Sequence, residues 1–157
     1  MLKLRQVSKD DCRLIWTWAN DPEVRAVSFS SEAIPYENHV AWFESKLNDP
    51  SCYFYIAEDT NHEPVGQVRY EREGNEAEIS ISLYRKSRGK GYGPLLLRLA
   101  SQELFETAEV EVIHAYIKED NEASVGAFKK AGFVSIGTTR KSKHLAHHLV
   151  LRREELR

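Results

Sequence analysis

The stretch from Glu78 to Leu104 constrains the fold of this chain more than any other part of it. Residues 78–83 alternate strictly between polar and apolar side chains, which is typical of a strand with one buried face. Apolar residues spaced by three and four positions, from Leu96 onward, predict a helix that begins just before Pro94. The segment between them is basic and holds three glycines. A strand, a glycine-rich turn and a helix N-terminus with free N–H groups together predict a phosphate-binding site.

Two well-known phosphate loops do not fit this turn. The P-loop pattern G-x-x-x-x-G-K-[ST] is absent, because Gly89-Lys90 is followed by Gly91. The dinucleotide fingerprint G-x-G-x-x-G is poorly matched, since Pro94 follows and the unit lies in the middle of the chain. An ordinary glycine turn without a ligand remains the alternative.

Two motifs resemble one enzyme family. The residues Arg88-x-x-Gly91-x-Gly93 are similar to the [Q/R]-x-x-G-x-[G/A] pyrophosphate loop of the GNAT superfamily of N-acetyltransferases, which bind acetyl-coenzyme A. About thirty residues further on, Asn121 to Phe133 resembles the N-x-x-S/A segment of the same superfamily, which ends in K-x-G-F. The two motifs have the family's usual separation, and the resemblance covers nearly the whole chain.

The remaining periodicities predict an α+β fold. We expect strands at 2–7, 53–57, 65–70, 110–117, 133–138 and 145–151, helices at 8–20, 37–47 and 123–130, and a short helix and loop over 22–35. The order is β-α-α-β-β-β-α-β-α-β-β. In the GNAT superfamily this order forms a central, mostly antiparallel sheet with helices on both faces, and residues 1–157 are expected to form a single acetyltransferase domain.

The composition of the chain limits the kinds of partner that it can be expected to bind. The 157 residues carry a formal net charge of −2, which does not favour a nucleic-acid partner. No apolar run approaches the ~20 residues of a membrane span, and Met1 to Arg5 lacks the apolar core of a signal peptide, so we expect no membrane partner and a cytoplasmic location. Cys12 and Cys52 are too few and too distant for a zinc site, so no metal is expected. A monomer and a homodimer both remain open.

The resemblance also implies which residues hold acetyl-CoA. The backbone from Arg88 to Gly93 would bind the pyrophosphate, and the strand end at Leu83 and Tyr84 would pair with the pantetheine arm. A lysine near the end of the second motif would approach a phosphate, although a solvent-facing lysine is the alternative. The residues implied for acetyl-CoA are Leu83, Arg88, Gly89, Lys90, Gly91, Tyr92, Gly93, Asn121 and Lys130.

Acetyl transfer to an amine needs a group that accepts the amine's proton and one that returns a proton to the departing thiolate. Glu78 is the candidate base, and an exposed glutamate next to Glu76 is the alternative. Many relatives carry a tyrosine as acid where this chain has Phe128. We therefore expect the role to move to Tyr84, or else to another tyrosine near the loop or the next strand, or to water. The other candidates are Tyr92 and Tyr116.

The first half of the chain should form the acceptor side. Its segment from Trp16 to Arg25, followed by His39 and Trp42, resembles acetyltransferases that act on nucleotide-linked amino sugars. Arg25 could pair with a diphosphate and an aromatic ring could stack on a sugar or a base. The part W-x-N-D-P is shared with enzymes that acetylate the N-termini of ribosomal proteins. Taken singly, Trp42 is more often a core residue than a ligand, and His39 is more often a helix-surface histidine or one with its hydrogen bonds satisfied within the protein.

Three functions follow from these patterns. The first is acetyl-CoA-dependent acetylation of a primary amine on a small molecule, with an amino sugar on a nucleotide as the preferred acceptor. The second is acetylation of a protein or peptide N-terminus, which an open, acidic acceptor groove would favour. The third is a non-catalytic module that binds acyl-CoA, which the phenyl ring of Phe128 makes conceivable.

Overall fold

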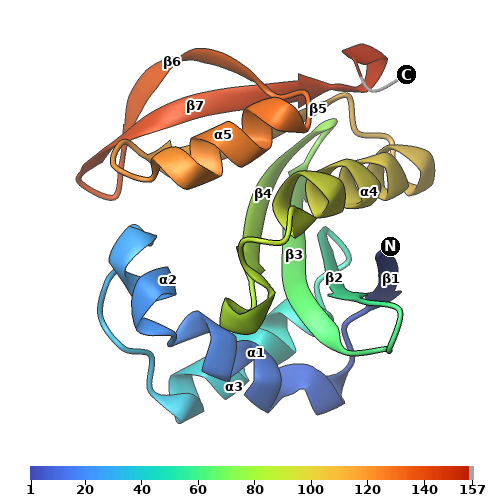
Figure 1. The fold of residues 1–157 in the computed structure, drawn as a ribbon, viewed down its shortest axis with the longest axis vertical. Coiled ribbons are helices and arrows are strands. Elements are labelled where there is room, and N and C mark those ends of the chain that lie inside the picture. The colour runs from blue at the N-terminus through green and yellow to red at the C-terminus, as the bar shows by residue number, and fades with distance from the viewer. Residues whose placement is uncertain (156–157) are drawn as a thin grey trace.

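The computed structural model describes residues 1–155, and its centre is a seven-stranded sheet in the order β1-β2-β3-β4-β5-β7-β6 (Figure 1). All neighbouring strands are antiparallel except β4 and β5, which are parallel. The expected mostly antiparallel α+β sheet is therefore confirmed. The strands are β1 (Lys3–Gln6), β2 (Cys52–Glu58), β3 (Pro64–Glu73), β4 (Glu76–Leu83), β5 (Val112–Lys118), β6 (Val134–Lys141) and β7 (His144–Arg152).

Helices cover both faces of the sheet, as expected (Figure 1). On one face, α4 and α5 pack over the large core, in which Leu96 and Leu104 of α4 are fully buried. On the other face, α1 and α3 enclose a smaller core in which Ile15 and Phe43 pack on Ile56. The helices are α1 (Cys12–Ala19), α2 (Pro22–Val27), α3 (Tyr36–Leu47), α4 (Tyr92–Thr107) and α5 (Glu122–Lys130).

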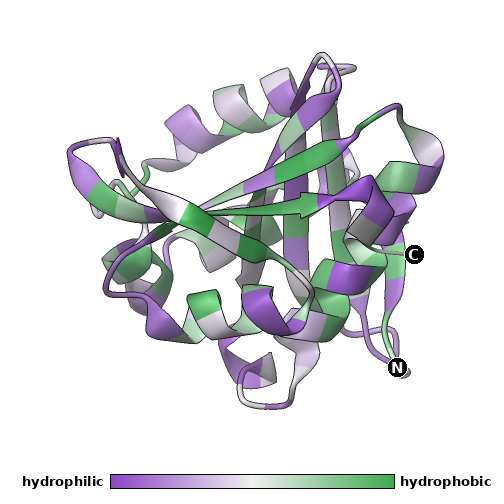
Figure 2. Ribbon diagram, turned by 90° about the horizontal axis from the view of Figure 1, so that it is seen from above, coloured by the Kyte–Doolittle hydropathy of each residue, from purple (hydrophilic) through white to green (hydrophobic). Residues whose placement is uncertain are grey.

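Hydrophobic periodicity locates most of these elements correctly, and Figure 2 shows hydrophobic and hydrophilic residues intermixed along the strands and helices. In β4, Ala77 and Ile79 are buried against the large core, whereas Glu78 between them is partly exposed.

A buried hydrogen bond of 2.9 Å between the hydroxyls of Tyr70 and Ser101 connects β3 to α4. The short helix expected after Pro22 is α2, and the side chain of Asp21 accepts from its first turn. None of the helices formed by residues 1–155 is both long and apolar enough to cross a bilayer.

Element boundaries differ from the predictions where pairing or capping decides them. The first helical residues, Lys9–Asp11, form a 3-10 turn before α1 because Ser8 and Asp11 make a capping box. The strand predicted to end at residue 138 continues to Lys141, since β6 and β7 pair as a long hairpin up to the contact Lys141↔His144. Both boundaries depend on hydrogen bonds to other residues, which the spacing of hydrophobic residues does not reveal.

Arg153 closes the C-terminal end of α4. Its guanidinium donates to the carbonyl oxygens of Phe105 at 2.6 Å, Ala108 at 2.8 Å and Val110 at 3.0 Å. Carbonyls at a helix C-terminus lack intrahelical donors, so a positive charge with several donors is favourable there. This side chain therefore holds the end of α4 to the segment that leads into β5.

We expect Arg153→Ala to lower the free energy of unfolding by about 2 kcal/mol, because three carbonyl oxygens lose a charged donor. Arg153→Lys should recover little of this, since an ammonium cannot span three acceptors in a plane. Urea denaturation measures both changes. Arg98→Ala is the matched control, because Arg98 lies on the exposed face of the same helix, and an equal loss in this variant would contradict the capping role.

Candidate active site

The site begins where β4 and β5 separate. The two strands share only three register pairs, from Glu76↔Val112 to Glu78↔His114. Beyond them β4 continues beside β3 as far as Leu83, while β5 continues beside β7. The strands therefore diverge like the arms of a V, and a cavity of about 760 Å³ lies along the opening.

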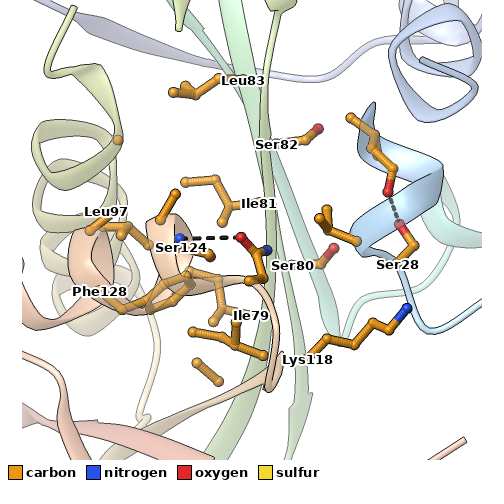
Figure 3. Close-up of a pocket in the computed structure, with 18 of the residues that line it drawn as sticks. Ser28, Ile79, Ser80, Ile81, Ser82, Leu83, Leu97, Lys118, Ser124 and Phe128 are labelled. Atoms are coloured by element: carbon orange, nitrogen blue, oxygen red, sulfur yellow. Dashed lines mark hydrogen bonds between the residues drawn. The ribbon is translucent and has the colours of Figure 1, made fainter. Parts of the chain in front are cut away.

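The two walls of this cavity differ chemically because side chains of β4 alternate. Ile79, Ile81 and Leu83 point toward α4 and α5, whereas Ser80 and Ser82 point toward α2 (Figure 3). The first wall is completed by apolar residues such as Leu97 and Phe128, and the second by polar and charged ones. The apolar wall suits a pantetheine arm and the polar wall suits an acceptor. The polar and charged residues on the second wall include Glu23, Arg25, Ser28, Arg69, Lys118 and Lys141.

The glycine-rich turn opens onto one end of the cavity. Gly91 is the N-cap of α4, with φ of +78°, and Gly89 has φ of +77°. A Cβ atom at either position would meet nothing within 4 Å, so the space in front of the turn is open. The first N–H groups of α4 have no intrahelical partner and carry the positive end of the helix dipole. An anion the size of a diphosphate fits this arrangement.

Most of the residues that the sequence implied for acetyl-CoA come together here. Lys90 and Lys130 are exposed and do not line the cavity, so their side chains have no contact with it in this structure. The residues that do line it are Leu83, Arg88, Gly89, Gly91, Tyr92, Gly93 and Asn121.

The backbone of Arg88 belongs to the glycine-rich turn, whereas its side chain has a structural role. Its guanidinium donates to Glu23 at 2.5 Å, to Asp21 at 3.2 Å and to the carbonyl oxygen of Leu83 at 3.1 Å. It therefore ties the start of α2 to the glycine turn across the mouth of the cavity. The side chain of Asn121 likewise has a structural role, because it accepts from the backbone N–H of Ser124 at 3.3 Å and caps α5 (Figure 3).

Glu78 lies on the cavity wall at the point where β4 and β5 part. Its carboxylate pairs with the ammonium of Lys141 at 3.1 Å. Lys141 also lies 4.3 Å from the centre of the Tyr116 ring, and all three residues line the cavity. A carboxylate in this place can receive a proton from an amine that is held in the cavity.

The tyrosines considered as acids lie in different places. Tyr84 stacks on Trp18 with 5.9 Å between ring centres and does not line the cavity, because the chain leaves β4 at Leu83 and turns away. The prediction for Tyr84 is therefore corrected, whereas Tyr92 and Tyr116 do line the cavity. Phe128 packs edge-to-face on Phe133 in the cavity wall, so no hydroxyl is present at that position.

Two of the three residues predicted for the acceptor also lie elsewhere. His39 is 2% exposed, and its Nε2 donates to the carbonyl oxygen of Cys12 at 2.9 Å. Trp42 packs edge-on against Phe54 in the smaller core. Neither side chain lines the cavity, so both predictions are corrected: these residues connect α3 to the sheet and to α1. Arg25 does line the cavity.

Sequence reasoning missed two basic residues of the cavity, Arg69 and Lys118. Arg69 lies under the ring of Trp42 at 4.8 Å, and its Nε atom is buried without a hydrogen-bond partner. Lys118 reaches from β5 across to α2, where its ammonium donates to the carbonyl oxygen of Ala26 at 3.3 Å. Alternation places both side chains on the polar face of their strands, but only the divergence of β4 and β5 brings them to one cavity.

Comparison with known proteins agrees with this geometry. The model of the family described as Acetyltransferase (GNAT) domain matches residues 1–134. The chain belongs to the GNAT acetyltransferases. Acetyl-CoA is therefore its acyl donor, and the α4 turn and the apolar wall are the parts of the cavity that fit it.

Individual relatives are distant. The acetyltransferase PseH of Campylobacter jejuni is 23% identical over 137 residues, which cover 85% of each chain. The spermidine N-acetyltransferase of Vibrio cholerae, solved with CoA and spermine, superposes with a TM-score of 0.88 at 18% identity, covering 99% of this chain and 97% of the other. The aminoglycoside acetyltransferase AAC(6')-Ib, solved with coenzyme A and kanamycin, gives 0.86 at 23% identity, with 99% and 96% covered. At these identities, the solved structures support the fold.

The part of β4 that has no β5 neighbour matches the pantetheine arm in length. The extended pantetheine arm is about as long as four residues of extended chain, roughly 14 Å. Leu83 lies beside the glycine turn, where its Cδ1 would be 3.9 Å from a Cβ atom at Gly93. Four residues back along β4 is Ile79, next to Glu78. An arm anchored at the turn therefore reaches the point where the two strands meet.

We expect Gly91→Val to abolish acetyl-CoA binding while the protein stays folded. A β-branched residue at φ of +78° is strained by ~1–3 kcal/mol, and its side chain would occupy the open space in front of α4. Isothermal titration calorimetry with acetyl-CoA measures the loss. Gly74→Val is the matched control, because Gly74 has φ of +65° in a remote turn, and unchanged affinity in Gly91→Val would contradict the assignment of the turn.

We expect the buried His39 to make stability depend on pH. Burial lowers the pKa of His39, although its bond to Cys12 acts in the opposite direction. The unfolded chain takes up a proton near pH ~6.5 while the folded protein does not, so stability falls as the pH drops below that value. Urea denaturation at several pH values should give a shallower dependence for His39→Gln. The exposed His62 provides the control His62→Gln, and an equal change in both variants would refute this role.

Proposed function

We propose that this GNAT acetyltransferase transfers the acetyl group to the primary amine of a small acceptor, an amino sugar carried on a nucleotide. The observation that carries the proposal is the basic charge of the acceptor wall. Arg25 and Lys118 line it together with Arg69, whose Nε lies 3.8 Å from Glu71, and the first two suit an acceptor with an anionic diphosphate.

The charges of Arg25 and Lys118 are not neutralised by carboxylates in the part of the chain that the structure describes. Arg25 donates to the carbonyl oxygens of Ser30 at 3.0 Å and Glu32 at 3.3 Å, and its buried Nε has no partner. Lys118 donates to a backbone carbonyl oxygen. Both cations therefore keep a net charge with which an anionic acceptor can pair.

The acidic residues of the cavity are already paired. Glu23 binds Arg88 and Glu78 binds Lys141, and among residues 1–155 these are the only carboxylates on the cavity lining. A polycation needs several free carboxylates to replace its water. Spermine and kanamycin, which are bound in two of the solved structures, are polycations of this kind. The charge of the wall therefore favours an anionic acceptor over such molecules.

Phe29 supports the same acceptor class. It lines the cavity on the loop after α2, and its ring lies 6.2 Å from that of His144, at the start of β7. An aromatic ring at the rim can stack on a nucleobase or on a pyranose face. Of the amino-terminal segment that resembles the enzymes acting on nucleotide-linked amino sugars, Glu23 and Arg25 line the same cavity.

Glu78 is the base in this proposal. It accepts a proton from the acceptor's ammonium, and the neutral amine then attacks the thioester held along β4. The glycine turn and the apolar wall contribute by positioning, since they hold the donor in line with the amine. Phe128 cannot return a proton to the thiolate, so this step falls to water or to Tyr116, the tyrosine next to Lys141 on the cavity wall.

The alternative acceptor is the N-terminus of a protein or peptide. A groove that binds a peptide by its ammonium group would be open and acidic. The acceptor wall here carries unpaired basic residues, which argues against this alternative.

A thiol-release assay over a panel of amines tests the proposal. We expect turnover with a nucleoside-diphosphate amino sugar, and much weaker turnover with the free amino sugar, spermidine or an N-terminal peptide. Lys118→Met should raise the KM for the nucleotide-linked acceptor roughly tenfold with kcat nearly unchanged, because it removes one charge from binding. Lys143→Met is the control on the exposed turn between β6 and β7. Equal or better turnover of spermidine would overturn the acceptor assignment.

A further inference from the structure

Lys141 occupies a place on the cavity wall that suits an acceptor ammonium. Its Nζ lies 3.1 Å from the carboxylate of Glu78 and 4.3 Å from the centre of the Tyr116 ring. A carboxylate and the face of an aromatic ring both attract an ammonium. The protein thus presents one of its own primary amines to the base.

The groups behind Tyr116 hold this arrangement in place. His148 stacks on the ring with 4.5 Å between ring centres, so the ring contacts both an imidazole and an ammonium. A hydrogen bond of 2.8 Å joins Nε2 of His148 to Nδ1 of His114, and Nε2 of His114 donates to Glu76 at 2.6 Å. Burial lowers the pKa of His148, and the charges of His114 and Lys141 lower it further, so its ring is neutral at pH 7 and does not repel Lys141.

Lys141 also lies within reach of the acyl group. An arm anchored at the glycine turn extends along β4 for roughly four residues and ends beside Glu78, to which Lys141 is bound. The side chain is 34% exposed and comes from β6, at the edge of the sheet, so it can move by the small distance that attack requires. An arginine at position 141 would lack a nucleophilic amine, and a shorter residue would not reach the acyl group.

We propose that Lys141 is a second acceptor: in the absence of the small acceptor, the enzyme acetylates its own Lys141 at Nζ. This inference rests on the proposed role of Glu78 and of the cavity as an acetyl-transfer site. Glu78 takes one proton from the ammonium, and the amine nitrogen attacks the thioester carbonyl. The new N–C bond replaces the C–S bond, coenzyme A leaves as a thiolate that takes a proton from water, and Glu78 releases its proton to solvent.

Acetylation of Lys141 changes the site in a definite way. The amide carries no charge, so the ion pair with Glu78 and the attraction to the Tyr116 face are both lost. Glu78 is then a free carboxylate on the acceptor wall. Modification of this one side chain would thus alter the charge that an incoming acceptor meets.

Incubation of the full chain with acetyl-CoA and no acceptor, followed by intact mass and peptide mapping, tests this inference. We expect one acetyl group per chain at Lys141, formed roughly 100-fold faster than at Lys143, because only Lys141 is held beside a base and a bound donor. Lys143 is an exposed lysine two residues away that reports non-enzymatic acetylation. Equal rates at the two lysines would overturn the proposal.

Two variants complete the test. Lys141→Arg keeps the charge next to Glu78 but should abolish incorporation, and Glu78→Gln should reduce the rate at position 141 to that at Lys143. Calorimetry of acetyl-CoA with the unmodified enzyme separates the two proposals. If acetyl-CoA binds and a small acceptor is acetylated while Lys141 stays unmodified, only self-acetylation is refuted. If acetyl-CoA does not bind, the proposed function fails as well.

Discussion

The separation of β4 from β5 is the constraint on which the rest of the structure depends. A strand within a sheet normally exchanges hydrogen bonds along both edges. After Glu78, β4 keeps β3 on one side but loses β5 on the other, because β5 continues with β7. Its exposed edge from Ile79 to Leu83 then needs partners from elsewhere. The amide groups of a pantetheine arm are suitable partners, so we propose that the divergence that makes the cavity also provides the edge that binds the donor.

The two sides of the opening are held by different forces. On the donor side, Leu97 and Phe128 belong to the large core that packs α4 and α5 on the sheet. On the acceptor side, α2 has no buried residue, and it is joined to the sheet by polar contacts from Arg88 and Lys118. Apolar packing resists displacement more than exposed ion pairs do. The apolar wall is thus held more firmly than α2, which is only one part of the acceptor wall.

The fold and the glycine-rich turn before α4 could be predicted because both depend on local sequence. The alternation from Glu78 to Leu83 and the glycines before α4 act over a few residues, and the structure has the strand, turn and helix that they predict. The predictions for His39 and Trp42 show the limit of local sequence patterns. The helical spacing shows which residues share one side of α3, but it does not show whether that side faces a ligand cavity or the core. In the structure His39 and Trp42 pack against Phe43 and Phe54 of the smaller core.

The sequence by itself determined the order of the elements, the glycine-rich turn before α4 and the family, because periodicity, glycine conformations and motif spacing depend on residues close together in the chain. Only the tertiary structure decided the acceptor wall. Lys118 and Lys141 come from β5 and β6, yet they share a cavity with Glu78 of β4. Their meeting depends on how far the strands diverge and on the pairing of β6 with β7, and these are properties of long-range packing that no local pattern encodes.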